Sequence, residues 1–141
     1  MTGAGLHALD AVLSVAGPLK RAKGQILERK PPPAPLDTVS ALLEFESGVS
    51  GLLATVRATP FYWRVHAFGA RGNAEVLGET EIVVRMSGKP PERRQLPPVD
   101  SLRAELEAFA DAVQGRAPFP VTPGQMLETV AAFEAVVRSL G

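Results

Sequence analysis

Residues 1–18 read MTGAGLHALDAVLSVAGP, and their pattern organises the interpretation of the whole chain. Their apolar side chains recur at helical spacing: Leu6, Leu9, Val12, Leu13 and Ala16. This spacing predicts an amphipathic helix with one apolar face. We expect Gly17-Pro18 to end the helix, because proline disfavours helical geometry at the preceding residue and has no backbone N–H to donate.

A polar stripe lies beside the apolar face of this predicted helix. His7, Asp10 and Ser14 stand at positions i, i+3 and i+7, which share one narrow face at about 100° per residue. An imidazole, a carboxylate and a hydroxyl on one face can exchange protons with a ligand hydroxyl. A His–Asp pair at this spacing is also often a simple surface hydrogen bond, so the spacing alone leaves both interpretations open.

Composition limits the classes of protein and partner. The 141 residues suit one domain, residues 1–141, with a core of its own. Fifteen basic and fifteen acidic residues cancel, so we expect neither a nucleic acid nor an anionic membrane as partner. The chain has no cysteine and two histidines, so we expect no disulfide and no metal site. Without an apolar run of about 18 residues, the sequence predicts a soluble protein, and a reducing cytoplasm fits it.

The remaining chain predicts strands followed by helices. The strand segments are residues 19–27, 38–46, 49–58, 61–68, 74–77 and 81–86. Helices are expected over residues 101–114 and 122–140, and extended proline-rich loops over 31–35 and 89–98. This order predicts an α+β fold, an open antiparallel β-sheet of about five to six strands with helices packed on one face. Leu42 and Phe68 oppose the main apolar sets of their strands, which predicts a second apolar sheet face and a homodimer or tetramer that uses it.

The segment Thr2-Gly3-x-Gly5-x-His7-x-x-Asp10, followed by Gly17-Pro18, resembles the first helix of the C-terminal domain in the glucose–fructose oxidoreductase/inositol dehydrogenase (Gfo/Idh/MocA) family. Segments within residues 37–48, 65–72 and 108–139 also resemble, more weakly, the hairpins and closing helices of that domain, and they occur in the same order along the chain. In that family the helix carries an Asp, and often a His four residues later, into the sugar-binding cleft. Asp10 matches the Asp, whereas Ser14 lies where the His usually is, so the sequence departs from the family's pattern at the catalytic position.

The resemblance implies the substrate-binding and oligomerising domain of an NAD(P)-dependent oxidoreductase for a sugar, cyclitol or related polyol. The family's N-terminal Rossmann nucleotide-binding domain is absent from this sequence, which has no Gly-x-Gly-x-x-Gly between a strand and a helix. NAD or NADP would be bound mainly by that missing domain, so we expect this chain alone to be inactive.

Within this interpretation three residues have roles. Asp10 would orient a ligand hydroxyl or the neighbouring imidazole. Ser14 can only hydrogen-bond to the substrate and cannot replace histidine as a base, because the pKa of a serine hydroxyl lies far above neutrality. Either His7 or a lysine of the missing domain would take the hydroxyl proton. The alternative is a non-catalytic assembly module, in which the helix site has decayed and the sheet is the functional surface.

Overall fold

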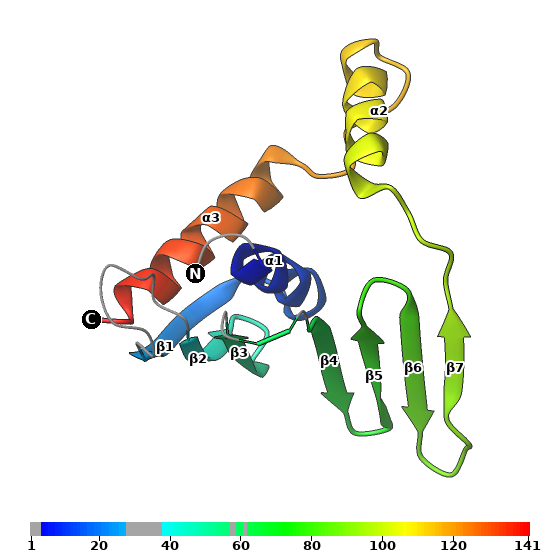
Figure 1. Ribbon diagram of the computed structural model, residues 1–141. Helices are drawn as coiled ribbons and strands as arrows, with labels where there is room; N and C mark the ends of the chain where they lie inside the picture. The colour runs from blue at the N-terminus through cyan, green and yellow to red at the C-terminus, as the bar shows by residue number, and fades with distance from the viewer. Residues whose placement is uncertain (1–3, 28–37, 57–58, 61) are drawn as a thin grey trace. The chain divides into compact units, whose positions relative to one another are not determined.

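The computed structural model describes residues 4–27, 38–56, 59–60 and 62–141. This part of the chain contains three helices and seven strands, coloured in chain order in Figure 1. It forms two compact units, residues 1–62 with 126–141 and residues 63–125. All strand pairs are antiparallel, so the predicted α+β class is confirmed. The proline-rich segment 31–35 and residues 1–3 of the N-terminal motif lie outside the described residues.

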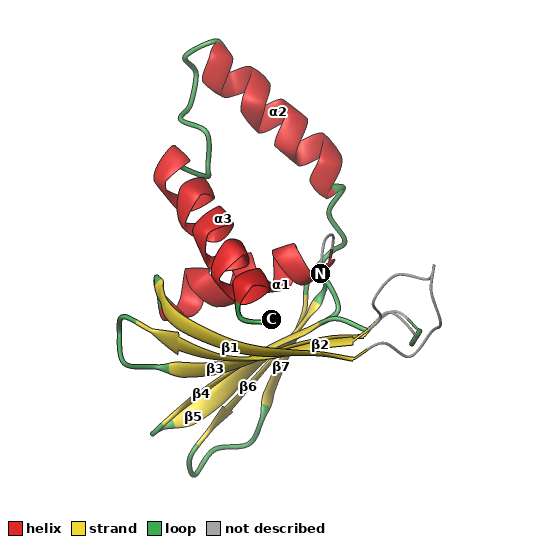
Figure 2. Cartoon of the chain, turned by 90° about the vertical axis from the view of Figure 1, so that its left-hand side faces the viewer, coloured by secondary structure: helices red, strands yellow, loops and turns green. Residues whose placement is uncertain are grey.

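The first unit is a three-stranded sheet with helices on one face. Its elements are α1 (Ala4–Ala16), β1 (Leu19–Leu27), β2 (Thr38–Phe45), β3 (Ser50–Val56) and most of α3 (Pro123–Arg138). Strand β2 lies between β1 and β3. Figure 2 shows α1 and α3 together over the same face of this sheet.

The core of this unit lies between the sheet and the two helices. Alternate residues of β2 point into it, as the period of two predicted: Val39, Ala41, Leu43 and Phe45. Leu9 and Leu13 of α1, and Ala132 and Val136 of α3, pack in the same cluster. Because each large apolar side chain contributes roughly 1.5–3 kcal/mol when fully buried, this cluster is what holds α1 on the sheet. The apolar face predicted for α1 is confirmed at Leu9, Val12, Leu13 and Ala16, whereas Leu6 is exposed.

Three glycines of the first unit lie where a side chain would be unfavourable. Gly17 has a φ of 87°, and its N–H donates to the Leu13 carbonyl at 2.8 Å, which ends α1 as predicted. Gly48 has a φ of 81° in the turn between β2 and β3, a backbone conformation that residues with a side chain rarely adopt. Within β3, a Cβ on Gly51 would lie 3.1 Å from the Phe45 ring, which is the close approach that a glycine in a strand predicts.

The second unit contains a four-stranded antiparallel meander and one helix. The strands are β4 (Arg64–Gly69), β5 (Gly72–Leu77), β6 (Glu81–Met86) and β7 (Glu92–Gln95), and they follow one another in the sheet. Helix α2 spans Ser101–Val113.

Three strand predictions need correction. We expected one open sheet of about five to six strands, whereas the described residues form seven strands in two sheets. Strand β7 lies inside the segment 89–98, which we predicted to be a loop. The sequence did not predict this strand because Glu92–Gln95 contains no apolar residue and therefore no alternation of apolar and polar residues. Its edge position explains how prolines are tolerated nearby. Strand β4 begins at Arg64, so residues 62 and 63 of the predicted strand precede it, and residue 61 lies outside the described residues.

The helix boundaries agree with their capping signals. The N–H of Arg103 donates to the Asp100 carboxylate at 3.1 Å, so Asp100 is the N-cap of α2. At α3, the N–H of Gln125 donates to Thr122 Oγ1, and the N–H of Thr122 donates back to Gln125 Oε1 at 2.8 Å. This reciprocal pair is the capping box that Thr122 and Gln125 predicted.

The faces of the last two helices differ from the prediction. No residue of α2 is buried, although its apolar side chains have helical spacing: Leu102, Leu106, Phe109, Ala110 and Val113. On α3 the buried residues are Ala132 and Val136. Of the predicted face, Phe133 is partly buried against the core, whereas Met126, Val130 and Val137 are exposed. Helical spacing identifies an apolar arc, but which neighbour covers it depends on tertiary packing.

Candidate functional site

The predicted polar stripe lies on the exposed side of α1. Because Leu9 and Leu13 face the core, His7, Asp10 and Ser14 are all turned outward on the same helix. The three residues are thus on the side of α1 that a ligand or a second domain can reach. Surface depressions lined by α2 residues and by β4–β6 residues include none of them.

Asp10 connects α1 to α3. The Thr129 hydroxyl of α3 donates to Asp10 Oδ1 at 2.7 Å, which fixes one oxygen of the carboxylate. Within the described part of the chain no hydrogen bond joins Asp10 to His7. The second oxygen of Asp10 remains available as an acceptor for a ligand hydroxyl.

Ser14 and His7 differ in how they are held. The Ser14 hydroxyl donates to the Ala11 carbonyl of its own helix at 2.8 Å, so its proton is directed back to the backbone. His7 is exposed and makes no hydrogen bond or ion pair with the described residues. Both ring nitrogens of His7 are therefore accessible, as a base for an external hydroxyl would require.

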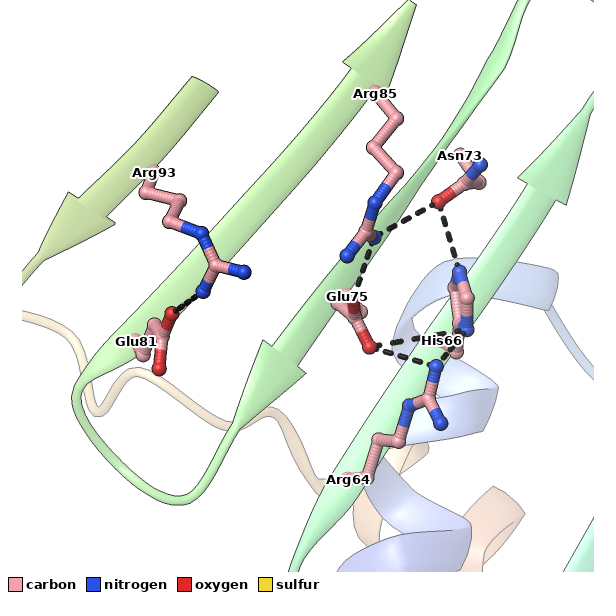
Figure 3. Close-up of polar contacts among 7 residues, drawn as sticks. All are labelled: Arg64, His66, Asn73, Glu75, Glu81, Arg85 and Arg93. Atoms are coloured by element: carbon pink, nitrogen blue, oxygen red, sulfur yellow. Dashed lines mark hydrogen bonds and ion pairs between the residues drawn. The ribbon is translucent and has the colours of Figure 1, made fainter. Parts of the chain in front are cut away.

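A second group of polar residues lies on the four-stranded sheet, and sequence reasoning missed it as a group. We call it the Glu75 cluster: Arg64 and His66 of β4, Asn73 and Glu75 of β5, and Arg85 of β6. Figure 3 shows these side chains meeting above three neighbouring strands, and it also shows the ion pair between Glu81 of β6 and Arg93 of β7. Glu75 is only 4% exposed and is the buried charged residue of the described chain.

Glu75 is bound by arginine on both sides. Arg85 Nη1 lies 2.5 Å from Glu75 Oε1, and Arg64 Nη2 lies 2.7 Å from Oε2. The hydrogen bond from Arg85, together with the charges of both guanidinium groups, lowers the pKa of Glu75 below its usual 4.5 although desolvation opposes this. The carboxylate is therefore ionised at neutral pH, where its charge is cancelled by one of the two arginines.

His66 takes part as a neutral imidazole. Arg64 Nη2 lies 2.7 Å from His66 Nδ1, and an arginine can donate only to an unprotonated nitrogen. The ring proton is thus assigned to Nε2, which donates to Asn73 Oδ1 at 3.0 Å. The His66 ring also stacks against Phe68, with centroids 3.9 Å apart.

Strand register explains why the sequence did not reveal the Glu75 cluster. His66 pairs with Glu75, and Asn73 pairs with Arg85, across two different strand pairs. The alternation of Arg64 and His66 on one face of β4 was visible in the sequence, but their partners come from strands whose register the sequence does not specify. No group of three or more potential metal ligands occurs among the described residues.

A family profile matches residues 1–80, and its description is GFO/IDH/MocA C-terminal domain. The match covers more than half of the chain, including α1 with His7, Asp10 and Ser14. The chain belongs to the GFO/IDH/MocA family. No curated protein matches the sequence.

Solved structures of oxidoreductases share the fold of this family member. An oxidoreductase from Thermotoga maritima is 25% identical with a TM-score of 0.79, and the match covers 97% of this chain and 41% of that one. UDP-N-acetylglucosamine 3-dehydrogenase from Acidithiobacillus ferrooxidans is 21% identical with a TM-score of 0.84, over 96% and 45%. An Agrobacterium radiobacter oxidoreductase, solved with NAD+, L-tartaric acid and magnesium, is 16% identical with a TM-score of 0.81, over 97% and 45%. The chain thus spans less than half the length of these relatives.

None of the helices in the described ranges has the length and apolar character needed to cross a membrane.

Proposed function

We propose that this chain is the substrate-binding and dimerisation domain of an NAD(P)-dependent oxidoreductase that acts on a sugar, cyclitol or related polyol. The observation that carries the proposal is the family match over residues 1–80, which contains the whole polar stripe of α1. The oxidoreductases among the solved relatives support the same reaction class.

We expect the described residues to form no dinucleotide site of their own. Gly69–Gly72 joins β4 directly to β5, so no helix N-terminus follows it to hold a phosphate. We place NAD or NADP mainly on a nucleotide-binding domain outside this chain, and the chain alone is inactive in this proposal.

The proposed chemistry of this chain is the handling of the alcohol proton. Asp10, with one oxygen held by Thr129, accepts a hydrogen bond from a ligand hydroxyl and orients it. Either His7, whose ring nitrogens are accessible, or a lysine of the nucleotide-binding domain takes the proton as general base. Ser14 adds a hydrogen bond to the substrate once its bond to the helix backbone is exchanged.

The test measures binding first and turnover second. Polyols and sugars are screened for an increase in the melting temperature of the chain, because a ligand of the native state stabilises it. Asp10→Asn and His7→Gln should abolish the increase, whereas Glu105→Gln, which changes an exposed carboxylate on α2, should leave it intact. In an enzyme that contains both domains, unchanged turnover in both Asp10→Asn and His7→Gln would refute the proposed role of these residues in handling the alcohol proton.

The alternative, an assembly module, rests on the other face of the three-stranded sheet. Leu42 and Leu52 pair across β2 and β3 and are 59% and 78% exposed. An exposed apolar pair on a sheet favours self-association, so we propose a homodimer or tetramer through this face. Light scattering should show a multimer that Leu52→Lys dissociates. A multimer that binds no polyol would favour the assembly role over catalysis.

A further inference from the structure

Thr129 of α3 contacts the polar stripe from the side of α1 that borders the core. On α3, Thr129, Ala132 and Val136 stand at i, i+3 and i+7, so they share one face of the helix. Ala132 and Val136 are buried in the core, and Thr129 is partly buried. On α1, Asp10 is exposed but lies three residues before Leu13, which belongs to the same core. The hydrogen bond between Thr129 and Asp10 therefore lies at the edge of a core that holds both helices.

The hydroxyl of Thr129 is directed away from its own helix. A hydroxyl on a helix commonly donates to a backbone carbonyl three or four residues earlier, as Ser14 does to Ala11 at 2.8 Å. The Thr129 hydroxyl instead donates to Asp10 Oδ1 at 2.7 Å, a length typical of a charge-assisted bond between a hydroxyl and a carboxylate. Charge-assisted bonds are roughly twice as strong as bonds between neutral groups, so this contact can select one conformer of Asp10.

The bond limits how Asp10 can present its carboxylate to a ligand. An aspartate on a helix has access to roughly two of the three staggered χ1 rotamers, because the third clashes with the preceding turn, and its χ2 distribution is broad. The bond to Thr129 selects the arrangement that brings Oδ1 to α3. Within the described ranges of the chain Oδ2 has no hydrogen-bond partner, so it is left as an acceptor for an external hydroxyl.

We propose that Thr129 is a positioning residue for the ligand site on α1: it holds Asp10 so that Oδ2 accepts a hydrogen bond from a hydroxyl of the polyol ligand. The inference rests on the proposed function, and it extends the site from α1 to α3 within the first unit. Thr129 acts through Asp10 and needs no contact with the ligand.

The size of the effect follows from the conformers that the bond excludes. When only a fraction of the molecules has the conformer that binds, the apparent dissociation constant rises by the inverse of that fraction. Without the Thr129 hydroxyl, Asp10 would regain a second χ1 rotamer and its range of χ2, so the affinity for a polyol should fall at least about threefold.

The test titrates the complete 141-residue chain with myo-inositol and with D-glucose, a cyclitol and a sugar, by calorimetry. Thr129→Val keeps the branched shape but removes the hydroxyl, and should weaken binding at least about threefold. Thr129→Ser retains the hydroxyl and should restore the affinity, which a loss caused by packing alone would not allow. Thr55→Val is the matched control, because Thr55 is a partly buried threonine of the same unit whose hydroxyl has no partner among the described residues.

A second measurement follows Asp10 without any ligand. The three-bond NMR coupling between the backbone nitrogen and Cγ of Asp10 reports its χ1 rotamer. The unaltered chain should give the value of a single rotamer, and Thr129→Val should give an averaged value. Melting curves establish that each variant is folded at the temperature of the titration.

Equal affinity in the unaltered chain and in Thr129→Val would overturn the inference and leave the proposed function standing. A loss in Thr129→Ser or in Thr55→Val as large as that in Thr129→Val would also overturn it, because the hydroxyl would then not be the cause. If neither probe binds to the unaltered chain, the proposed function fails, and an unchanged Asp10 coupling in Thr129→Val would separately refute the positioning role.

Discussion

Leu9→Ala tests whether the core beneath α1 holds the helix that carries His7 and Asp10. Leu9 is 0% exposed and packs in the cluster with Phe45 and Val136. The substitution removes three carbon groups, which costs about 2.4 kcal/mol at about 0.8 kcal/mol for each. The cavity left behind adds to this, so we expect the free energy of unfolding to fall by about 3–4 kcal/mol.

Urea denaturation followed by far-UV circular dichroism measures the change. The midpoint should fall while the slope stays constant, because the surface exposed on unfolding is almost the same in both proteins. Val15→Ala is the matched control, since Val15 is on the same helix and 65% exposed. It should change the free energy of unfolding by no more than about 0.5 kcal/mol.

The result that would refute the reasoning is a similar loss in the two variants. If Leu9→Ala cost less than about 1 kcal/mol, Leu9 would not be a core residue in solution, because even partial collapse of a buried leucine site costs more. The stripe of His7 and Asp10 would then have no fixed orientation on the unit.

Three further predictions concern single contacts. The folded pKa of Glu75 is below its usual 4.5, so its carboxylate stabilises the native state above that pH, and the contribution disappears as the pH falls through the folded pKa; the stability gap between the parent and Glu75→Gln should shrink on acidification, and a constant gap would contradict this. Thr129→Val removes the hydrogen-bond donor to Asp10 and should lower the free energy of unfolding, measured by urea denaturation, by about 1 kcal/mol. In a double-mutant cycle, Thr129→Val should have little effect in a chain that already carries Asp10→Ala, and an equal effect in both backgrounds would contradict this. Gly72→Ala would place a Cβ 2.2 Å from a carbonyl oxygen of β6 and should lower the melting temperature, whereas Gly69→Ala meets nothing nearer than 3.7 Å and should not clash.

The sequence predicts the buried face of α1 better than that of α3. The core face of α1 was predicted because its apolar arc is interrupted by polar residues at helical intervals, and a helix of this kind can bury only one side. On α3 the same reasoning succeeded only for Phe133, because apolar residues occur around most of the helix and spacing cannot choose among them. Contact with Leu9 and the sheet selects Ala132 and Val136.

The candidate site shows the same difference. His7, Asp10 and Ser14 belong to one helix, so their common exposed face follows from helical geometry alone. The Thr129–Asp10 hydrogen bond joins residues 119 positions apart, and no local pattern predicts it. Arg64 and His66 lie on one strand, but the buried carboxylate of Glu75 that contacts both belongs to the next strand.

The sequence by itself determined the α+β class, the ends of the helices, the polar stripe and the family resemblance. Each of these depends on residues close together in the chain, where periodicity, capping and glycine conformation act directly. Only the tertiary structure decided which faces of α2 and α3 are covered, that Glu92–Gln95 pairs as a strand, and that Glu75 lies between two arginines. Those features depend on strand register and on packing between distant segments, and a shift of one residue in register would turn Glu75 to the other face of its sheet.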